Sequence, residues 1–297
     1  MAKQEDRVKE LMKRVGKIRI LTRRLIDDQL SGDYHSSFKG QGVEFDEVRP
    51  YEIGDDVRSI DWNVTARTGV PFIKRFAEER ELTIIFMVDV SGSQGYGSVT
   101  RSKMELAAEV TSLLAMTAIR NQDKIGLILF SDKIVKYIPP RKGQESVMRL
   151  VREVLASEDG AEGGTDIAAA LKFLNGVQKR KAVVFLVSDF MDEGYEKLLT
   201  ATNHHHDVIA VKVNDPAESA LPNVGLIELE DPETHELRIV DTADKTLRSQ
   251  FAARAQLKAE EVSTMFKKNG IDNLNLSTGH EYVSEVRALF KRRARKR

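Results

Sequence analysis

Residues 82–93 read LTIIFMVDVSGS, a continuous apolar run that ends in a carboxylate and two hydroxyls. A strand that is apolar on both faces is typical of a parallel sheet covered by helices on each side. The run therefore predicts an inner strand of such a sheet. Asp89, Ser91 and Ser93 follow it at alternate positions. These side chains could serve a serine nucleophile, a phosphate-binding loop or a site for a hard metal ion.

The composition is typical of a soluble globular protein with a sizeable core. The chain has 297 residues, 41% of them hydrophobic and 31% charged. Its 46 basic and 46 acidic residues give a formal net charge of zero, so no overall field attracts nucleic acid or a membrane. The absence of cysteine excludes disulfides and cysteine zinc sites. No apolar run approaches the roughly 20 residues that span a bilayer, and we expect a cytoplasmic protein.

Strands and helices alternate after Glu81, which predicts a doubly wound α/β domain over residues 81–290. Such an order forms a mostly parallel sheet, here of six strands, with helices on both faces. Predicted strands include residues 82–90, 124–131, 182–190, 207–213 and 273–276, and predicted helices begin near 103, 145, 167, 196, 245 and 281. Two alternating runs around a turn at residues 231–234 predict an inserted hairpin over about 222–241.

Residues 1–80 follow a different pattern and predict an N-terminal helix and a small strand-rich subdomain. Apolar residues at helical spacing predict an amphipathic helix that ends near Ser31 and Gly32. Short alternating runs between Gly, Pro and Asp residues follow it. We expect charged residues of this subdomain to join it to the main domain through buried, charge-assisted hydrogen bonds. Together with Trp62, these charged residues are Arg49, Asp55, Asp56, Arg58, Asp61 and Arg67, and a functional surface formed by them is the alternative.

Two polar runs have simple interpretations. The tail KRRARKR at residues 291–297 is expected to be a disordered, solvated end, although such a run can also bind nucleic acid or anionic lipid. His204, His205 and His206 are consecutive, and three consecutive side chains of a regular helix or strand cannot converge on one metal ion. We expect these histidines to be exposed polar residues.

Oxygen-bearing side chains recur at the ends of other predicted strands and loops. Thr165 and Asp166 lie in a glycine-rich loop before a helix, and Ser188 and Asp189 lie at the end of the predicted strand 182–190. The carboxyl ends of parallel strands meet at one edge of a sheet, where ligands of doubly wound folds bind. Thr165 and Asp189 are therefore expected to lie beside Asp89, Ser91 and Ser93. Asp166 is expected to cap the following helix.

Catalysis by a serine nucleophile and phosphate binding both fit this arrangement poorly. A nucleophile elbow requires G-x-S-x-G, whereas the residues two before Ser93 and Ser91 are Ser91 and Asp89. The three histidines precede a strand, which puts them at the opposite edge of the sheet from the serines. No G-x-x-x-x-G-K-[ST] or G-x-G-x-x-G motif is present.

A metal site uses every one of these oxygen-bearing residues. Mg²⁺, or alternatively Mn²⁺, prefers near-octahedral oxygen ligands and retains water. Hydroxyls of Ser91, Ser93 and Thr165, with the carboxylates of Asp89 and Asp189 close by, supply such ligands. Because only two carboxylates offset the ion, it would remain electrophilic toward a carboxylate brought by a partner. The pattern predicts a site for Mg²⁺ at the carboxyl edge of the sheet.

Asp89-x-Ser91-x-Ser93, Thr165 and Asp189 resemble the metal-ion-dependent adhesion site of von Willebrand factor type A domains. Residues 44–67, EFDEVRPYEIGDDVRSIDWNVTAR, followed by 72–81, FIKRFAEERE, resemble the bacterial family called domain of unknown function 58. In that family this segment precedes the type A domain, and many members carry transmembrane helices before it. This sequence shows no such helices, which leaves membrane association open.

The resemblance implies an adaptor or co-chaperone, because members of the family typically accompany MoxR-type AAA+ ATPases. We therefore expect a non-enzymatic, Mg²⁺-dependent protein-binding module with an ATPase partner that donates an Asp or Glu. A metal-assisted hydrolase or phosphatase using Asp89 or a serine is the alternative of another class. A scaffold with an empty site is the third possibility.

Overall fold

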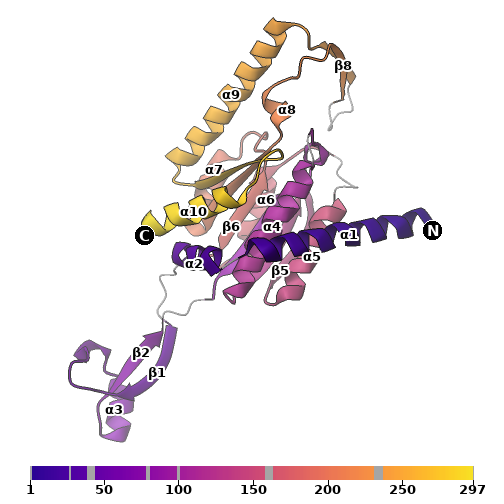
Figure 1. Cartoon of the computed structure of the whole chain (residues 1–297). Helices are drawn as coiled ribbons and strands as arrows, with labels where there is room; N and C mark the ends of the chain where they lie inside the picture. Colours follow the sequence, from indigo (N-terminus) through magenta and orange to yellow (C-terminus); the bar gives the residue numbers. More distant parts are fainter. Residues whose placement is uncertain are drawn as a thin grey trace. The chain divides into compact units, whose positions relative to one another are not determined.

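The computed structural model describes residues 2–26, 28–38, 44–77, 81–98, 101–157, 163–230 and 237–296 (Figure 1). The chain divides into two compact units. The larger unit comprises Met1–Ser37 and Thr83–Arg297, and the smaller comprises Phe38–Leu82. The smaller unit is thus inserted in the sequence of the larger one.

The larger unit contains a six-stranded sheet in the order β10-β7-β6-β3-β4-β5. Its strands are β3 (Thr83–Asp89), β4 (Lys124–Phe130), β5 (Ile134–Arg141), β6 (Val183–Ser188), β7 (Asp207–Asn214) and β10 (Asp272–Ser277). Every neighbouring pair is parallel except β4 with the edge strand β5, which is antiparallel. The prediction of an α/β fold with a mostly parallel sheet is confirmed. The run at residues 82–90 forms an inner strand, as predicted.

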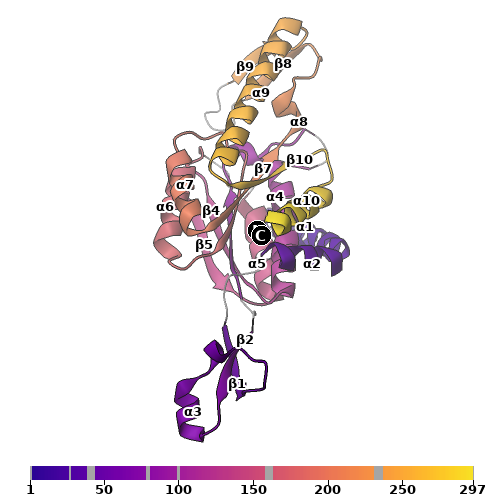
Figure 2. The same cartoon turned by 90° about the vertical axis from the view of Figure 1, so that its left-hand side faces the viewer.

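Helices cover both faces of this sheet (Figure 2). One face carries α6 (Ile167–Val177), α7 (Glu196–His205) and α9 (Lys245–Lys268), whose apolar residues form one buried cluster with β3, β4, β6 and β7. The other face carries α4 (Lys103–Arg120), α5 (Gln144–Ser157) and α10 (Val283–Lys296). Burial on both faces explains why β3 is apolar throughout.

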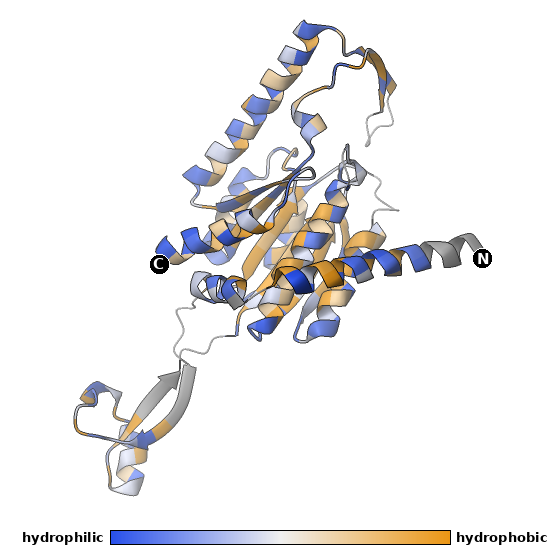
Figure 3. Cartoon of the chain, in the orientation of Figure 1, coloured by the Kyte–Doolittle hydropathy of each residue, from blue (hydrophilic) through white to orange (hydrophobic). Residues whose placement is uncertain are grey.

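The central strands hold the core (Figure 3). All residues of β3 from Ile84 to Asp89 are buried. On one face of the sheet the rings of Phe86 and Phe185 stack with their centroids 5.4 Å apart. Full burial of one such side chain contributes roughly 1.5–3 kcal/mol to stability. This packing in the core fixes the positions of β3 and β6, and with them the carboxyl ends of both strands.

The two N-terminal helices, α1 (Ala2–Leu25) and α2 (Asp28–Ser37), belong to the larger unit. They form two helices instead of one helix ending near residue 32. The Thr22 hydroxyl of α1 donates to Ser112 Oγ of α4 over 3.0 Å. The Tyr34 hydroxyl of α2 donates to Asp123 Oδ2 over 2.7 Å, and Ser37 Oγ donates to the carbonyl of Phe290 in α10. The predicted N-terminal segment 1–80 is therefore divided between the two units.

The smaller unit is built on one antiparallel pair, β1 (Glu44–Pro50) and β2 (Phe72–Ala77). Between them lie the 3-10 helix η1 (Val57–Ser59) and α3 (Trp62–Thr68), which Asp61 caps through two backbone N–H groups. Arg49 donates to both carboxylate oxygens of Asp55 over 2.9 and 2.7 Å. Both residues belong to the smaller unit, so this pair stabilises that unit.

The C-terminal part carries the hairpin and a last helix. Strands β8 (Leu226–Glu230) and β9 (Leu237–Asp241) form a separate antiparallel pair within the predicted residues 222–241, after the short helix α8 (Pro216–Ser219). The basic tail is not disordered over residues 291–296, because α10 continues to Lys296. Buried Arg293 donates there to Asp272 Oδ2 over 2.6 Å and to Asp207 Oδ2. Among the residues that the structure describes, none forms a helix both long and apolar enough to cross a bilayer.

Candidate metal-binding site

The loop after β3 presents the first three oxygen-bearing residues. Asp89, the last residue of β3, is buried, and its Oδ1 accepts the backbone N–H of Ser91 over 3.0 Å. This bond bends the chain back toward the carboxylate, as Asp commonly does in turns. The 3-10 helix η2 (Gly92–Gly95) follows. It brings the hydroxyl oxygens of Ser91 and Ser93 to 3.2 Å from each other.

The loop before α6 brings Thr165 to the same place. Gly163 has a φ of 91°, a conformation that L side chains rarely adopt. Its carbonyl accepts the N–H of Gly92 over 3.4 Å, which ties this loop to the turn after β3. Thr165 Oγ1 then lies 3.4 Å from Asp89 Oδ2 and donates to it. Asp166 caps α6 through the N–H of Ala169 over 2.7 Å, as predicted.

Asp189 reaches the cluster from the end of β6. Its Oδ2 accepts the Ser93 hydroxyl over 3.2 Å, and the preceding Ser188 donates to Asp89 Oδ2 over 2.8 Å. Phe190, which follows Asp189, has a φ of 58°. This is the left-handed region of backbone conformation, which residues other than glycine seldom adopt. Such a conformation costs on the order of 1–3 kcal/mol and is often found at functional sites. The buried ring of Phe190, packed edge-on against Phe266, holds this strained turn.

The structure thus brings together the five side chains that the sequence singled out, through hydrogen bonds between residues far apart in the chain. Their donor set is two carboxylates and three hydroxyls, which suits a hard cation such as Mg²⁺. Over the described ranges, no group of three or more His, Cys, Asp or Glu residues could hold a metal ion. A metal here would depend on hydroxyl ligands, and its binding remains a prediction.

The electrostatics of Asp89 favour a nearby cation. Burial, together with the negative charge of Asp189, raises the pKa of Asp89 to about 6. Hydrogen bonds from Ser91 and Ser188 oppose this rise without cancelling it. A cation bound beside Asp89 would relieve both unfavourable effects, because it would offset the charge repulsion and compensate for lost solvation.

Sequence reasoning missed a further member of the cluster, Lys103. Ser102 caps α4 in a capping box with Glu105, and Lys103 is the first residue of that helix. Lys103 itself is fully buried, and its Nζ lies 2.9 Å from Asp189 Oδ2 and 2.5 Å from Glu218 Oε1. Burial lowers the pKa of Lys103, but the two carboxylates outweigh it and raise the pKa overall. No local sequence pattern indicates the contact between Lys103 and Glu218, because the two residues are 115 positions apart in the chain.

The three histidines are not all exposed, contrary to the prediction. His206 is buried, and its Nδ1 accepts the N–H of Ala182 over 3.3 Å. Burial, with a smaller effect of His205, lowers the pKa of His206 to about 4. His206 directly precedes β7 and Ala182 directly precedes β6, so the histidine lies at the amino-terminal edge of the sheet. Asp89 and Ser91 are at the opposite edge, and a serine hydrolase triad is not formed.

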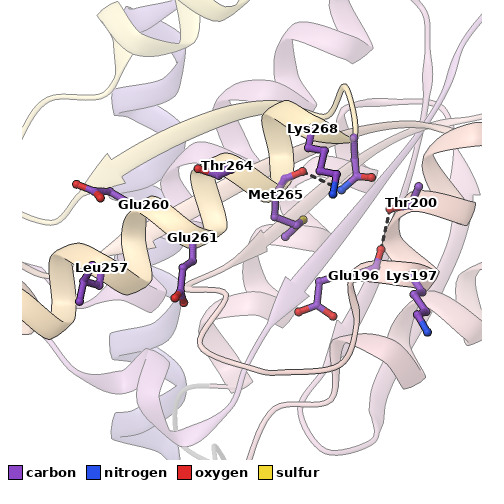
Figure 4. A pocket seen from close by; sticks show the side chains of 10 residues that line it. Glu196, Lys197, Thr200, Leu257, Glu260, Glu261, Thr264, Met265 and Lys268 are labelled. Carbon is purple, nitrogen blue, oxygen red and sulfur yellow. Dashed lines mark hydrogen bonds between the residues drawn. The ribbon is translucent and has the colours of Figure 1, made fainter.

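A separate cleft of about 600 Å³ lies between α7 and α9 (Figure 4). Its walls carry charged side chains of both signs, among them Glu196, Lys197, Glu261 and Lys268, with Leu257 at one end. The five side chains at the strand ends do not line it. The cleft is therefore distinct from the cluster at the carboxyl edge of the sheet.

Fold and site together define an α/β protein with a mostly parallel sheet and an oxygen-rich cluster at its carboxyl edge. The chain belongs to the family described as "Protein of unknown function DUF58", which matches residues 47–261. It is 28% identical over 273 residues to the uncharacterized protein Rv1480 of Mycobacterium tuberculosis, covering 91% of this chain and 85% of that protein. The uncharacterized protein MAV169 of Mycobacterium avium is 28% identical over 160 residues, which cover 53% of this chain and 94% of that protein.

Two solved structures are similar at low sequence identity. An aerotolerance-related membrane protein from Bacteroides fragilis gives a TM-score of 0.48 at 15% identity, covering 73% of this chain and 100% of that chain. The SpRpn10 VWA domain gives a TM-score of 0.37 at 8% identity, covering 70% of this chain and 94% of that chain. The fold assignment rests on the strand order and helix layers of the chain itself.

Proposed function

We propose that this protein is a non-enzymatic binding module whose contact with a partner protein runs through a Mg²⁺ ion at the carboxyl edge of the main sheet. The observation that carries the proposal is the convergence of Asp89, Ser91, Ser93, Thr165 and Asp189 from three loops. The raised pKa of Asp89 supports it, because burial and the charge of Asp189 both disfavour the ionised carboxylate and a cation beside Asp89 would offset both effects.

The hydroxyls of Ser91, Ser93 and Thr165 would hold the ion, with Asp89 and Asp189 close by. Mn²⁺ is an alternative ion with the same preference for oxygen. A bound cation would supply an electrophilic position for an incoming carboxylate. The protein's own side chains would not fully neutralise the charge of the ion. Three of the five oxygen donors are neutral, and Asp189 already pairs with Lys103.

The partner in this proposal is a MoxR-type AAA+ ATPase that donates an Asp or Glu side chain. Its support is the family to which the chain belongs, together with the resemblance of residues 44–81 to that family's N-terminal segment. The sequence contains no nucleotide-binding loop of the common types. An ATP-driven partner works where ATP is present, so the proposal places the protein in the cytoplasm as an adaptor or co-chaperone.

The test is binding of the ATPase to the full chain in Mg²⁺ and in EDTA, measured by calorimetry or pull-down. Binding should require Mg²⁺ and should fall at least tenfold in Ser91→Ala and Thr165→Ala, because loss of groups around a metal commonly weakens sites by about 10–100-fold. Neither change removes a charge. Glu145→Gln changes an exposed carboxylate in the first turn of α5, which follows the antiparallel strand β5 at the opposite edge of the sheet, and this control should bind normally.

Equal binding by wild type and Asp89→Ala in EDTA would contradict the proposal and would place the contact elsewhere on the chain. Turnover of an ester or phosphoester that disappears in Asp89→Ala would contradict it in a different way. That result would favour a metal-assisted hydrolase or phosphatase. A binding module should show no such activity.

A further inference from the structure

Lys103 is the one lysine with no exposed surface among the residues that the structure describes. Lysine is almost never fully buried unless it is paired, since removing its charge from water costs several kcal/mol. It begins α4, directly after the Ser102 cap, and its ammonium lies between Asp189 and Glu218. One of its two partners is thus a residue of the proposed metal site.

Asp189 Oδ2 is fully engaged by donors of the chain itself. It accepts Lys103 Nζ over 2.9 Å, Gln94 Nε2 over 3.1 Å and Ser93 Oγ over 3.2 Å. Asp189 Oδ1 accepts the N–H of Met191 over 3.1 Å. A cation that draws on Asp189 must therefore share this carboxylate with the ammonium group, and the two positive charges repel each other in a poorly solvated place.

Glu218 gives the ammonium a second anchor. It occupies the third position of α8, and its Oε2 accepts the N–H of Asp215 over 2.9 Å in a capping box. Its Oε1 faces Lys103. The ammonium can therefore shift toward Glu218 without becoming unpaired. Asp215 is itself held by Ser98 and by the buried Thr278 hydroxyl, so this anchor is fixed.

We propose that Lys103 is a built-in counter-cation that shares Asp189 with the metal ion and thereby sets the metal affinity of the site. Lys103 is a positioning residue, because it acts on the ion through Asp189. Glu218 tunes this effect, because it determines how firmly the ammonium holds Asp189. The inference rests on the proposed Mg²⁺ site, and it predicts opposite effects of changes at the two residues.

The test is Mg²⁺ and Mn²⁺ binding to the full chain, by calorimetry and by electron paramagnetic resonance of Mn²⁺, with thermal melts in EDTA. Lys103→Met should bind the ion at least about tenfold more tightly, because a repelling charge is lost. The same variant should melt at a lower temperature in EDTA, because Asp189 then lies buried without its cation. Glu218→Gln should bind the ion more weakly, because Lys103 then pairs with Asp189 alone.

Two further variants separate this role from simple stabilisation. Lys103→Arg keeps the charge and should retain wild-type affinity. Arg293→Met removes another buried cation, one that pairs with Asp207 and Asp272, and should lower the melting temperature without tightening metal binding. A merely structural Lys103 would behave like Arg293, with lower stability and no gain in affinity.

The outcomes distinguish this inference from the proposed function. If wild type binds the metal and Lys103→Met binds it with equal or lower affinity, the inference about Lys103 is wrong and the proposed metal site is unaffected. If Lys103→Met does not fold, Glu218→Gln decides, and unchanged or tighter binding by that variant would overturn the inference. Absence of metal binding in wild type and in every variant would overturn both.

Discussion

Asp89→Asn should stabilise the metal-free protein at neutral pH. The pKa of Asp89 is raised from 3.8 in a free chain to about 6 in the folded state. Between these values the folded state keeps a proton that the unfolded chain has released. Stability therefore falls as pH rises from about 4 to 6, and it stays lower above that window. A rise of about two units corresponds to about 3 kcal/mol at pH 7.5.

The Asn side chain fits the same hydrogen bonds. Its oxygen can accept the N–H of Ser91, and its amide can donate to the hydroxyl oxygens of Ser188 and Thr165, which now donate to Asp89. We expect a gain of about 1–3 kcal/mol at pH 7.5, with a rise in melting temperature of about 2–4 °C per kcal/mol. Mg²⁺ should stabilise wild type but not the variant.

The measurement is thermal and urea unfolding in EDTA at pH 7.5 and near pH 4. The advantage of Asp89→Asn over wild type should be present at pH 7.5 and should shrink near pH 4, where Asp89 keeps its proton in the folded state. Asp132→Asn, an exposed carboxylate, is the control and should change stability little at pH 7.5. A variant less stable than wild type at pH 7.5, or an advantage independent of pH, would refute the reasoning.

Two further predictions concern buried charge at the amino-terminal edge of the sheet, opposite the candidate metal site. Arg293→Met should destabilise the protein by about 3–5 kcal/mol in urea unfolding, because it removes the buried guanidinium that pairs with Asp207 and Asp272 and leaves Asp272 only the exposed Lys296. Exposed Arg295→Met should change stability by less than about 0.5 kcal/mol. Similar losses in both variants would contradict the assigned ion pairs. His206 has a pKa of about 4 when folded, against 6.5 in a free chain, so its contribution is complete above pH 6.5 and is lost as pH falls toward 4. His206→Gln should reduce this acid sensitivity in melts between those pH values, and an unchanged pH profile would count against it.

Much of the main sheet could be predicted because its signals are local. The apolar run of β3 needs no distant partner to be recognised, and α9 begins at Lys245, where a helix was predicted. The antiparallel course of β5 was not predicted as such. The sequence of a short strand does not show whether it pairs in parallel or antiparallel with its neighbour, because the orientation depends on the length and path of the connection before it.

The N-terminal helices and the basic tail were misjudged for a different reason. Their amphipathic or basic patterns are visible locally, but their partners are not. Tyr34 finds Asp123 across 89 residues, and Arg293 finds Asp207 across 86. A basic run cannot be distinguished from a solvated chain end by sequence alone. The carboxylates that pair with it, Asp207 and Asp272 at the starts of β7 and β10, are recognised only in the folded structure.

At the candidate site, the sequence pattern identified the residues that supply oxygen and overlooked the residue that supplies charge. Parallel strands bring their carboxyl ends to one edge, so Asp89, Thr165 and Asp189 could be grouped from topology alone. Lys103 is the first residue of α4, where no local sequence pattern indicates burial. Its pairing with Glu218 depends on α8, which follows α4 in the chain after four strands and three further helices.

The packing of α2 against α10 has a consequence for the order in which the chain can fold during synthesis. Ser37 donates to the carbonyl of Phe290, and the rings of Tyr34 and Phe290 meet edge to face with centroids 5.6 Å apart. A ribosome adds about 5–20 residues per second, so roughly a quarter of a minute or more separates the emergence of these two partners. During that interval the buried face of α2 has no α10 to cover it. A chaperone that binds nascent chains would find that face available until α10, Val283–Lys296, has been synthesised.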